Sequence, residues 1–234
     1  MTARRGLVLD VETRTSPALL RSSGRAGAPA KMPRGLQVLT AGAVLRFEQD
    51  QSGLCRAVEG RSADAASIGE AGLVRMLERE LAELRDAAGM LVTFNGSHDL
   101  QSIRLAALRL RLFSNGGAAR WLDAGREDHH DLMLAFGDGP ARWPSLDDLA
   151  TALQARVPHM VVAAHPDVRP ERTKCEIDVA VTMVVHLHLL AERARSREPL
   201  RIGIEELAEG LRAEPRSPHL AAVLQSALMR GQLG

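Results

Sequence analysis

The sequence predicts an α/β protein, on three observations. Strand-like apolar runs come first, at about residues 6–12, 37–47 and 53–59. Helix-like and strand-like segments then alternate along the chain. With 234 residues, 45% of them hydrophobic, the chain can bury one good core. We therefore expect one α/β domain over residues 1–195 and a short C-terminal helical extension over residues 196–234.

The later elements follow from periodicity and turn residues. Leu73 and Leu77 belong to an apolar stripe at helical spacing, which predicts a helix over residues 69–87. The remaining elements are expected as a strand at 90–95, a helix at 98–112, a short fifth strand at 120–123, and helices beginning at Asp131, Ser145 and Glu176. The Pro-rich stretch 157–170 is expected to be a loop.

Two acidic residues, Asp10 and Glu12, end the first apolar run. Side chains alternate along a strand, so both carboxylates are expected on one face, with Val11 on the other. Burying such a pair is costly unless a cation neutralises it, and hard divalent ions prefer oxygen ligands. The first strand therefore predicts a divalent metal site.

Two further aspartates suit the same site. Asp99 follows a strand-like run and the turn signal Asn95-Gly96, so it is expected in the first turn of a helix. Asp178 lies on or beside the apolar face of a later helix, which runs through Val185. A carboxylate that faces a core needs a partner, and a shared cation would supply one.

These motifs, taken in order, resemble a known family. An Asp-x-Glu-Thr strand at 10–13, an Asn-Gly-Ser-His-Asp corner at 95–99 and an Asp in a late helix resemble the DEDD superfamily of 3′-to-5′ exonucleases. Segments 130–133 and 145–149 are weaker matches, and the likeness spans about residues 6–192. The run Cys-Glu-Ile-Asp-Val at 175–179 is nearest the branch related to the proofreading domains of family B DNA polymerases.

The resemblance implies a ribonuclease-H-like mixed five-stranded sheet and a two-metal phosphodiesterase acting on single-stranded or unpaired 3′ ends of DNA or RNA. Asp10 would bridge two Mg²⁺ or Mn²⁺ ions. Glu12 and Asp178 would complete the shell of the first ion, and Asp99 would hold the second. Paired ions activate a water and stabilise the leaving oxygen. The resemblance also implies substrate contacts from residues in or beside the first two motifs, namely Thr13, Arg14, Asn95 and His98.

The sequence departs from the family where active members place a Tyr or a His to orient or deprotonate the attacking water. Lys174 and Thr173 stand at those positions, the chain has no tyrosine, and His98 replaces an aromatic residue. A desolvated lysine can act as a base or contact a phosphate, whereas nearby carboxylates would keep it charged. His165, in the loop before the last motif, is another candidate base.

Three classes of function stay open. The first is the metal-dependent exonuclease, with Lys174 among its catalytic residues. The second is a nucleic-acid-binding pseudo-nuclease, in which Lys174 marks the loss of the usual base. The third is a structural or partner-binding domain on the same scaffold, since a fold does not fix a function.

An Arg-rich stretch follows the first strand. No acidic residue lies between Glu12 and Glu48, although the net charge of the whole chain is only +1. Residues 14–35 are expected to form a long loop beside the proposed metals. Such a loop either clamps a phosphate backbone or is an ordinary disordered insertion.

Other features bound the remaining possibilities. The histidine pairs at 129–130 and 186–188 have the wrong spacing to converge on a zinc ion.

Cys55 and Cys175 are far apart in the sequence, which predicts reduced thiols in a cytoplasmic protein. We also expect no signal peptide and no membrane span. A C-terminal stripe of Leu220, Leu224 and Leu228 is expected to pack on the core, or else against a second copy in a homodimer.

Overall fold

The computed structural model of the chain describes residues 3–23, 34–113, 116–123, 127–137, 144–153, 169–212, 217, 219–220 and 222–224. Five strands form one mixed sheet in the order β3-β2-β1-β4-β5. The strands are β1 (Arg4–Thr15), β2 (Gln37–Gln49), β3 (Cys55–Asp64), β4 (Met90–Thr93) and β5 (His129–Asp131). β2 is antiparallel to β1 and β3, whereas β4 and β5 run parallel to β1. The predicted fold class is confirmed, and the arrangement is consistent with a ribonuclease-H-like fold.

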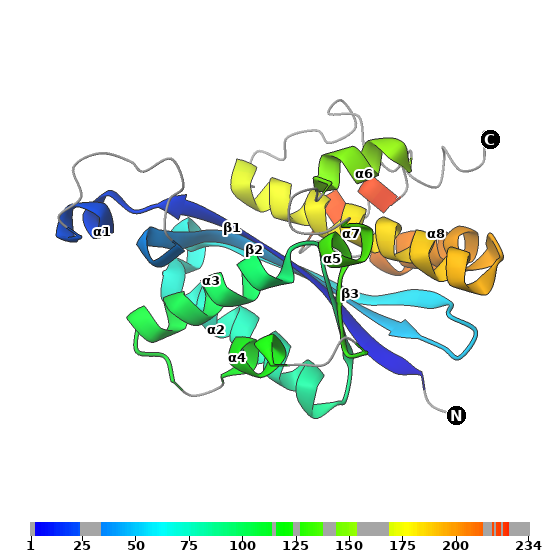
Figure 1. Cartoon of the computed structure of the whole chain (residues 1–234), viewed down its shortest axis with the longest axis horizontal. Helices are drawn as coiled ribbons and strands as arrows, with labels where there is room; N and C mark the ends of the chain where they lie inside the picture. Colours follow the sequence, from blue (N-terminus) through cyan, green and yellow to red (C-terminus); the bar gives the residue numbers. More distant parts are fainter. Residues whose placement is uncertain are drawn as a thin grey trace.

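Helices cover both faces of this sheet (Figure 1). One face carries α2 (Ala65–Asp86), α3 (Gly96–Arg109) and α4 (Gly117–Leu122). The other face carries α7 (Pro170–Ala194) and α8 (Glu198–Leu211). The short elements are α1 (Pro17–Ser22), η1 (Arg34–Leu36), α5 (Leu132–Phe136) and α6 (Leu146–Ala152).

The alternation of side chains in β1 assigns each residue to one of the two layers. Leu7 and Leu9 are buried against α2 and α3, and Val8 is buried on the α7 side. Asp10 and Glu12 share the direction of Val8, because side chains in a strand repeat every second residue. The two carboxylates of the central strand therefore face α7.

The fifth strand is not where the sequence placed it. Residues predicted as a strand at 120–123 belong to α4 or follow it directly, and β5 forms further along the chain. The carboxylate of Glu78 accepts hydrogen bonds at the start of α4, including one of 3.4 Å from the Ala118 amide. The indole nitrogen of Trp121 donates to the carbonyl oxygen of Leu81 at 2.8 Å. The helical turn is therefore held by residues of α2, and the local sequence does not contain its cap.

Two boundaries differ from those predicted. β1 continues to Thr15 and is followed by α1, so the predicted loop at 14–35 begins with regular structure, and residues 24–33 lie outside the described part of the chain. α7 begins at Pro170, six residues before Glu176, with proline in its first turn. Proline is favoured there because the first helical amides have no partner within the helix. Lys174 is therefore a helical residue and does not precede the helix.

The described part of the C-terminal region packs in cis. α8 lies against β3 and α7. Leu220 and Leu224 are fully buried in the core that α7 shares with the sheet, and Leu228 lies outside the described residues. The two leucines of the stripe that suggested a homodimer are thus covered by their own chain. No helix in the described part of the chain is long and apolar enough to cross a membrane.

Candidate metal centre

Asp10 and Glu12 lie on the central strand, between β2 and β4. Their cross-strand neighbours on β2 are Ala43 and Ala41. Facing residues on adjacent strands are the ones whose side chains crowd each other, so two alanines leave room above this stretch of sheet. A bulge follows directly, between Glu12 and Thr13, and the regular alternation ends there.

Helix α7 brings Asp178 to this pair. Asp10, Glu12 and Asp178 each offer one carboxylate oxygen, and these three oxygens lie within 4.8 Å of one another. Asp178 is far from the other two in sequence, so only the packing of α7 on the sheet makes the group. Three of the four predicted acids thus form one cluster.

Asp99, the fourth predicted acid, lies close to this cluster without being one of its three members. It is buried in the first turn of α3, with 4% of its surface exposed. Burial raises the pKa of Asp99 well above its ordinary value, and repulsion from Asp10 and then Asp131 raises it further. The repulsion from Asp10 that raises the pKa of Asp99 therefore agrees with the predicted position of Asp99 beside the same site.

Asp10 is the member of the cluster whose pKa is raised most. Burial, followed by repulsion from Asp178, raises the pKa of Asp10 to about 8, although Lys174 and a hydrogen bond with the Cys175 thiol act in the opposite direction. Its Oδ2 atom is buried and has no hydrogen-bond partner among the described residues. A buried carboxylate oxygen without a partner is costly, and a cation would remove that cost. An all-oxygen set of this kind suits Mg²⁺ or Mn²⁺.

Lys174 spans two of the clustered acids. Its Nζ atom donates to Oδ2 of Asp178 at 2.8 Å and to Oε1 of Glu12. Burial of the ammonium tends to lower the pKa of Lys174, but the contacts with Asp178 and Glu12 outweigh it and raise the pKa above its ordinary value. Lys174 is therefore an ammonium at neutral pH, and its environment does not prepare it to act as a base.

The residues expected to contact substrate have different surroundings. Asn95 caps α3 and accepts a hydrogen bond of 3.4 Å from the His98 amide. His98 is half-buried, and burial and the charge of Arg34 lower its pKa, against the influence of Glu12. Thr13 follows the bulge and Arg14 is exposed. His165, the alternative base, lies outside the described residues.

One end of the Arg-rich stretch is fixed near the acids. Arg34 donates to the side chain of Gln101 and, at 3.4 Å, to the carbonyl oxygen of Ser97, both on α3. Its charge also acts on His98. The stretch therefore returns to the sheet at the helix turn that carries Asp99, and it brings a cation there.

Two residues with a place in the site were missed from the sequence. Asp131 accepts hydrogen bonds from the amides of Gly96 at 3.0 Å and Met133 at 3.1 Å, so it joins β5 to the start of α3. Cys175 is buried and hydrogen-bonds with Asp10. Cys175 lies three residues before Asp178, so both side chains are on one face of α7. This spacing is the sequence feature that could have identified Cys175 as a neighbour of the site.

The histidines in the described part of the chain do not form a metal site. The only group of three or more His, Cys, Asp or Glu residues suited to an ion in the described ranges is the acidic one. His186 is buried, its ring centroid lies 5.5 Å from that of His130, and burial lowers the pKa of His186 to about 3. His186 is therefore a neutral core histidine.

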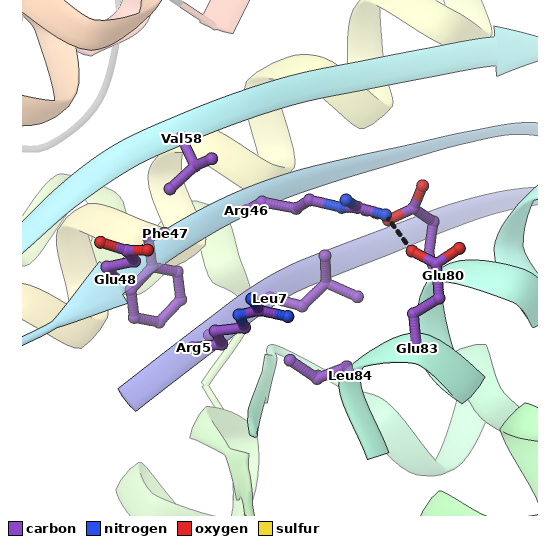
Figure 2. Close-up of a pocket in the computed structure, with 10 residues that line it drawn as sticks. Arg5, Leu7, Arg46, Phe47, Glu48, Val58, Glu80, Glu83 and Leu84 are labelled. Atoms are coloured by element: carbon purple, nitrogen blue, oxygen red, sulfur yellow. Dashed lines mark hydrogen bonds and ion pairs between the residues drawn. The ribbon is translucent and has the colours of Figure 1, made fainter. Parts of the chain in front are cut away.

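A separate pocket lies on the opposite face of the sheet (Figure 2). Its volume is about 240 Å³, and it is lined by residues of β1, β2, β3 and α2. Arg46 in this pocket pairs with Glu80 at 2.5 Å and with Glu83 at 2.7 Å. It contains none of the predicted site residues, and each of its carboxylates is paired with an arginine. The acidic cluster is therefore the better candidate site.

Gly96 provides a test of how tightly the corner beside Asp99 is packed. A Cβ atom at this position would overlap the imidazole ring of His129 and the hydroxyl group of Thr93. We expect Gly96→Ala to lower the free energy of unfolding by about 1–3 kcal/mol and to weaken Mn²⁺ binding, because α3 must shift. Urea unfolding and calorimetric titration measure both effects. Gly35→Ala, where a Cβ meets open space, is the control. Equal stability of the two variants would contradict the expectation.

Comparisons with known proteins do not assign a family. No protein-family profile matches the chain, and no curated protein matches it significantly. The fold and the site therefore define its class, which is an α/β protein with a five-stranded mixed sheet and an acidic cluster on the central strand. The resemblance to DEDD exonucleases stays a prediction from the sequence motifs.

Proposed function

We propose that the protein is a divalent-metal-dependent 3′-to-5′ exonuclease acting on single-stranded or unpaired nucleic-acid ends. The observation that carries the proposal is the buried Oδ2 atom of Asp10, which has no partner in the described structure and lies in a cluster with Glu12 and Asp178. Mutually repelling carboxylates at the centre of a sheet cost stability, so their presence favours a bound cation.

The site residues have distinct parts in this proposal. Asp10, Glu12 and Asp178 would hold the first ion, and Asp99 would help to hold a second. Bound Mg²⁺ or Mn²⁺ would supply activated water and stabilise the leaving oxygen. Arg34 is held at the helix turn that carries Asp99, and Arg14 is exposed two residues after Glu12. These two cations would attract a phosphate backbone without regard to its sequence. Both cysteines are free and buried, which fits the reducing cytoplasm.

The direct test uses the unmodified protein and two oligonucleotides. A single-stranded DNA or RNA labelled at its 5′ end should be shortened stepwise from the 3′ end in Mn²⁺, and not in EDTA. The same oligonucleotide with a blocked 3′ terminus should persist. A folded protein that binds Mn²⁺ but leaves both oligonucleotides intact would contradict the proposal.

A second candidate is a nucleic-acid-binding pseudo-nuclease. The observation in its favour is Lys174, which stands where active relatives of the resembled family carry Tyr and which is paired with Glu12 and Asp178. This candidate predicts oligonucleotide binding without turnover, and no loss of binding when the acids are neutralised. A structural or partner-binding domain predicts binding of neither Mn²⁺ nor oligonucleotide, so the same assays separate all three classes.

A further inference from the structure

The ammonium of Lys174 lies where a cation would bind. It contacts Glu12 and, at 2.8 Å, Asp178. These are two of the three acids whose oxygens converge within 4.8 Å. The third acid, Asp10, keeps a buried oxygen for which the described residues provide no partner. The lysine therefore neutralises part of the acidic cluster and leaves part of it unsatisfied.

The side chain of Lys174 has room to rotate away from these acids into solvent. Its side chain is 60% exposed, whereas the side chains of Glu12 and Asp178 are 23% and 22% exposed. The two hydrogen bonds described for Nζ both go to these acids. Lysine carries a compact, strongly hydrated charge on a flexible stem, so rotation into solvent restores its hydration at little steric cost. A divalent ion carries twice the charge and contacts all three acids, so it would outcompete the ammonium.

We propose that Lys174 is a resident counter-cation of the acidic site, which binds Glu12 and Asp178 in the metal-free protein and is displaced into solvent when a divalent cation binds. The inference rests on the metal binding of the proposed function and adds its regulation. The lysine keeps the site intact without metal, and it raises the concentration of metal that is needed to fill the site.

The first experiment compares Lys174→Met with the unmodified protein. Without its ammonium, the site should bind Mn²⁺ about fivefold to tenfold more tightly in calorimetric titration, because no group must be displaced. In EDTA the same variant should melt about 2–4 °C lower, because the repulsion between Glu12 and Asp178 is no longer neutralised. Arg201→Met is the matched control, since Arg201 on α8 also pairs with two carboxylates, Glu198 and Glu205, on an exposed surface. It should leave Mn²⁺ affinity unchanged.

The second experiment needs no variant. Lys31 and Lys174 are the only two lysines of the chain. Limited acetylation with peptide mapping should show Lys174 modified several-fold faster when Mn²⁺ is present, because its ammonium no longer pairs with carboxylates. Lys31 reports any general effect of Mn²⁺ on the reagent. An unchanged Lys174 rate would overturn the proposal.

The outcomes separate this inference from the proposed function. If the unmodified protein binds Mn²⁺ and Lys174→Met binds it no more tightly, the counter-cation role is overturned and the exonuclease proposal survives. If only Lys174→Met binds Mn²⁺, the lysine blocks the site and is not displaced, so the displacement and the metal-dependent function of the unmodified protein are both overturned. If neither binds Mn²⁺, both proposals are overturned.

Discussion

Asp10→Asn should abolish metal-dependent hydrolysis and, at the same time, stabilise the metal-free protein. Asp10 is the acid at the centre of the sheet with a buried oxygen that lacks a partner in the described part of the chain. Asparagine preserves its shape and removes its charge. We expect the rate of oligonucleotide digestion to fall at least about 10³-fold, because the proposed site would lose one of the carboxylates that hold its metal. Single-turnover digestion in Mn²⁺ measures this loss.

The gain in stability follows from the raised pKa of Asp10. The pKa is about 8 in the folded protein, against an ordinary value of 3.8. As pH rises, the unfolded chain releases this proton first, so the contribution of Asp10 to stability falls steadily between about pH 4 and pH 8. One pKa unit corresponds to about 1.4 kcal/mol, and relaxation of the structure around a buried charge reduces the sum. In EDTA at pH 8 we expect Asp10→Asn to be more stable by on the order of 3 kcal/mol.

Urea unfolding at pH 5 and pH 8 measures this second effect. The unmodified protein should lose stability between these two pH values in EDTA, and Asp10→Asn should lose less. Saturating Mn²⁺ should reverse the order at pH 8, because only the unmodified protein gains the binding free energy. Asp123→Asn, at an exposed aspartate after α4, is the control and should change neither activity nor pH dependence. A variant that is less stable than the unmodified protein at pH 8 in EDTA would contradict the assignment of Asp10.

The parts of the site that sequence could predict depend on local periodicity. The spacing of Asp10 and Glu12 fixes them on one face of a strand, whatever the rest of the chain does. The Asn95-Gly96 corner places Asp99 in a first helical turn, and the structure has Asn95 as its cap. The inward face of α7 follows from its apolar repeat. Each of these predictions needs fewer than ten consecutive residues.

The parts that sequence could not predict depend on distant partners. The start of α4 is capped by Glu78, which lies 39 residues from Gly117 in the chain. The contact between Lys174 and Glu12 joins residues 162 positions apart. No local pattern encodes such a pair, because it arises only when α7 packs on the sheet. The pair of Lys174 with Asp178 is local, since the two residues are four apart on a helix, but the pair with Glu12 could not be derived from the sequence.

Glu176 is a further residue whose role appears only in three dimensions. It is fully buried on α7, directly after Cys175 in the chain. Its Oε2 atom accepts from the His219 amide at 2.9 Å and lies 2.9 Å from Nδ1 of the His219 ring. Its Oε1 atom accepts from Ser62 on β3 and, at 3.3 Å, from Arg172. One carboxylate thus joins α7, the sheet and the C-terminal segment.

We expect Glu176→Ala to lower the free energy of unfolding by about 3–5 kcal/mol, because a buried network loses its acceptor and leaves Arg172 and His219 without it. Glu176→Gln keeps the shape and should cost less. Ser217, His219 and Leu220 are all buried, so the alanine variant should also expose this part of the chain to limited proteolysis. Glu205→Ala, which removes an exposed partner of Arg201, should cost no more than about 0.5 kcal/mol. Equal stability of the Glu176→Ala and Glu205→Ala variants in urea would show that the network does not hold α7, and hence Asp178, in place.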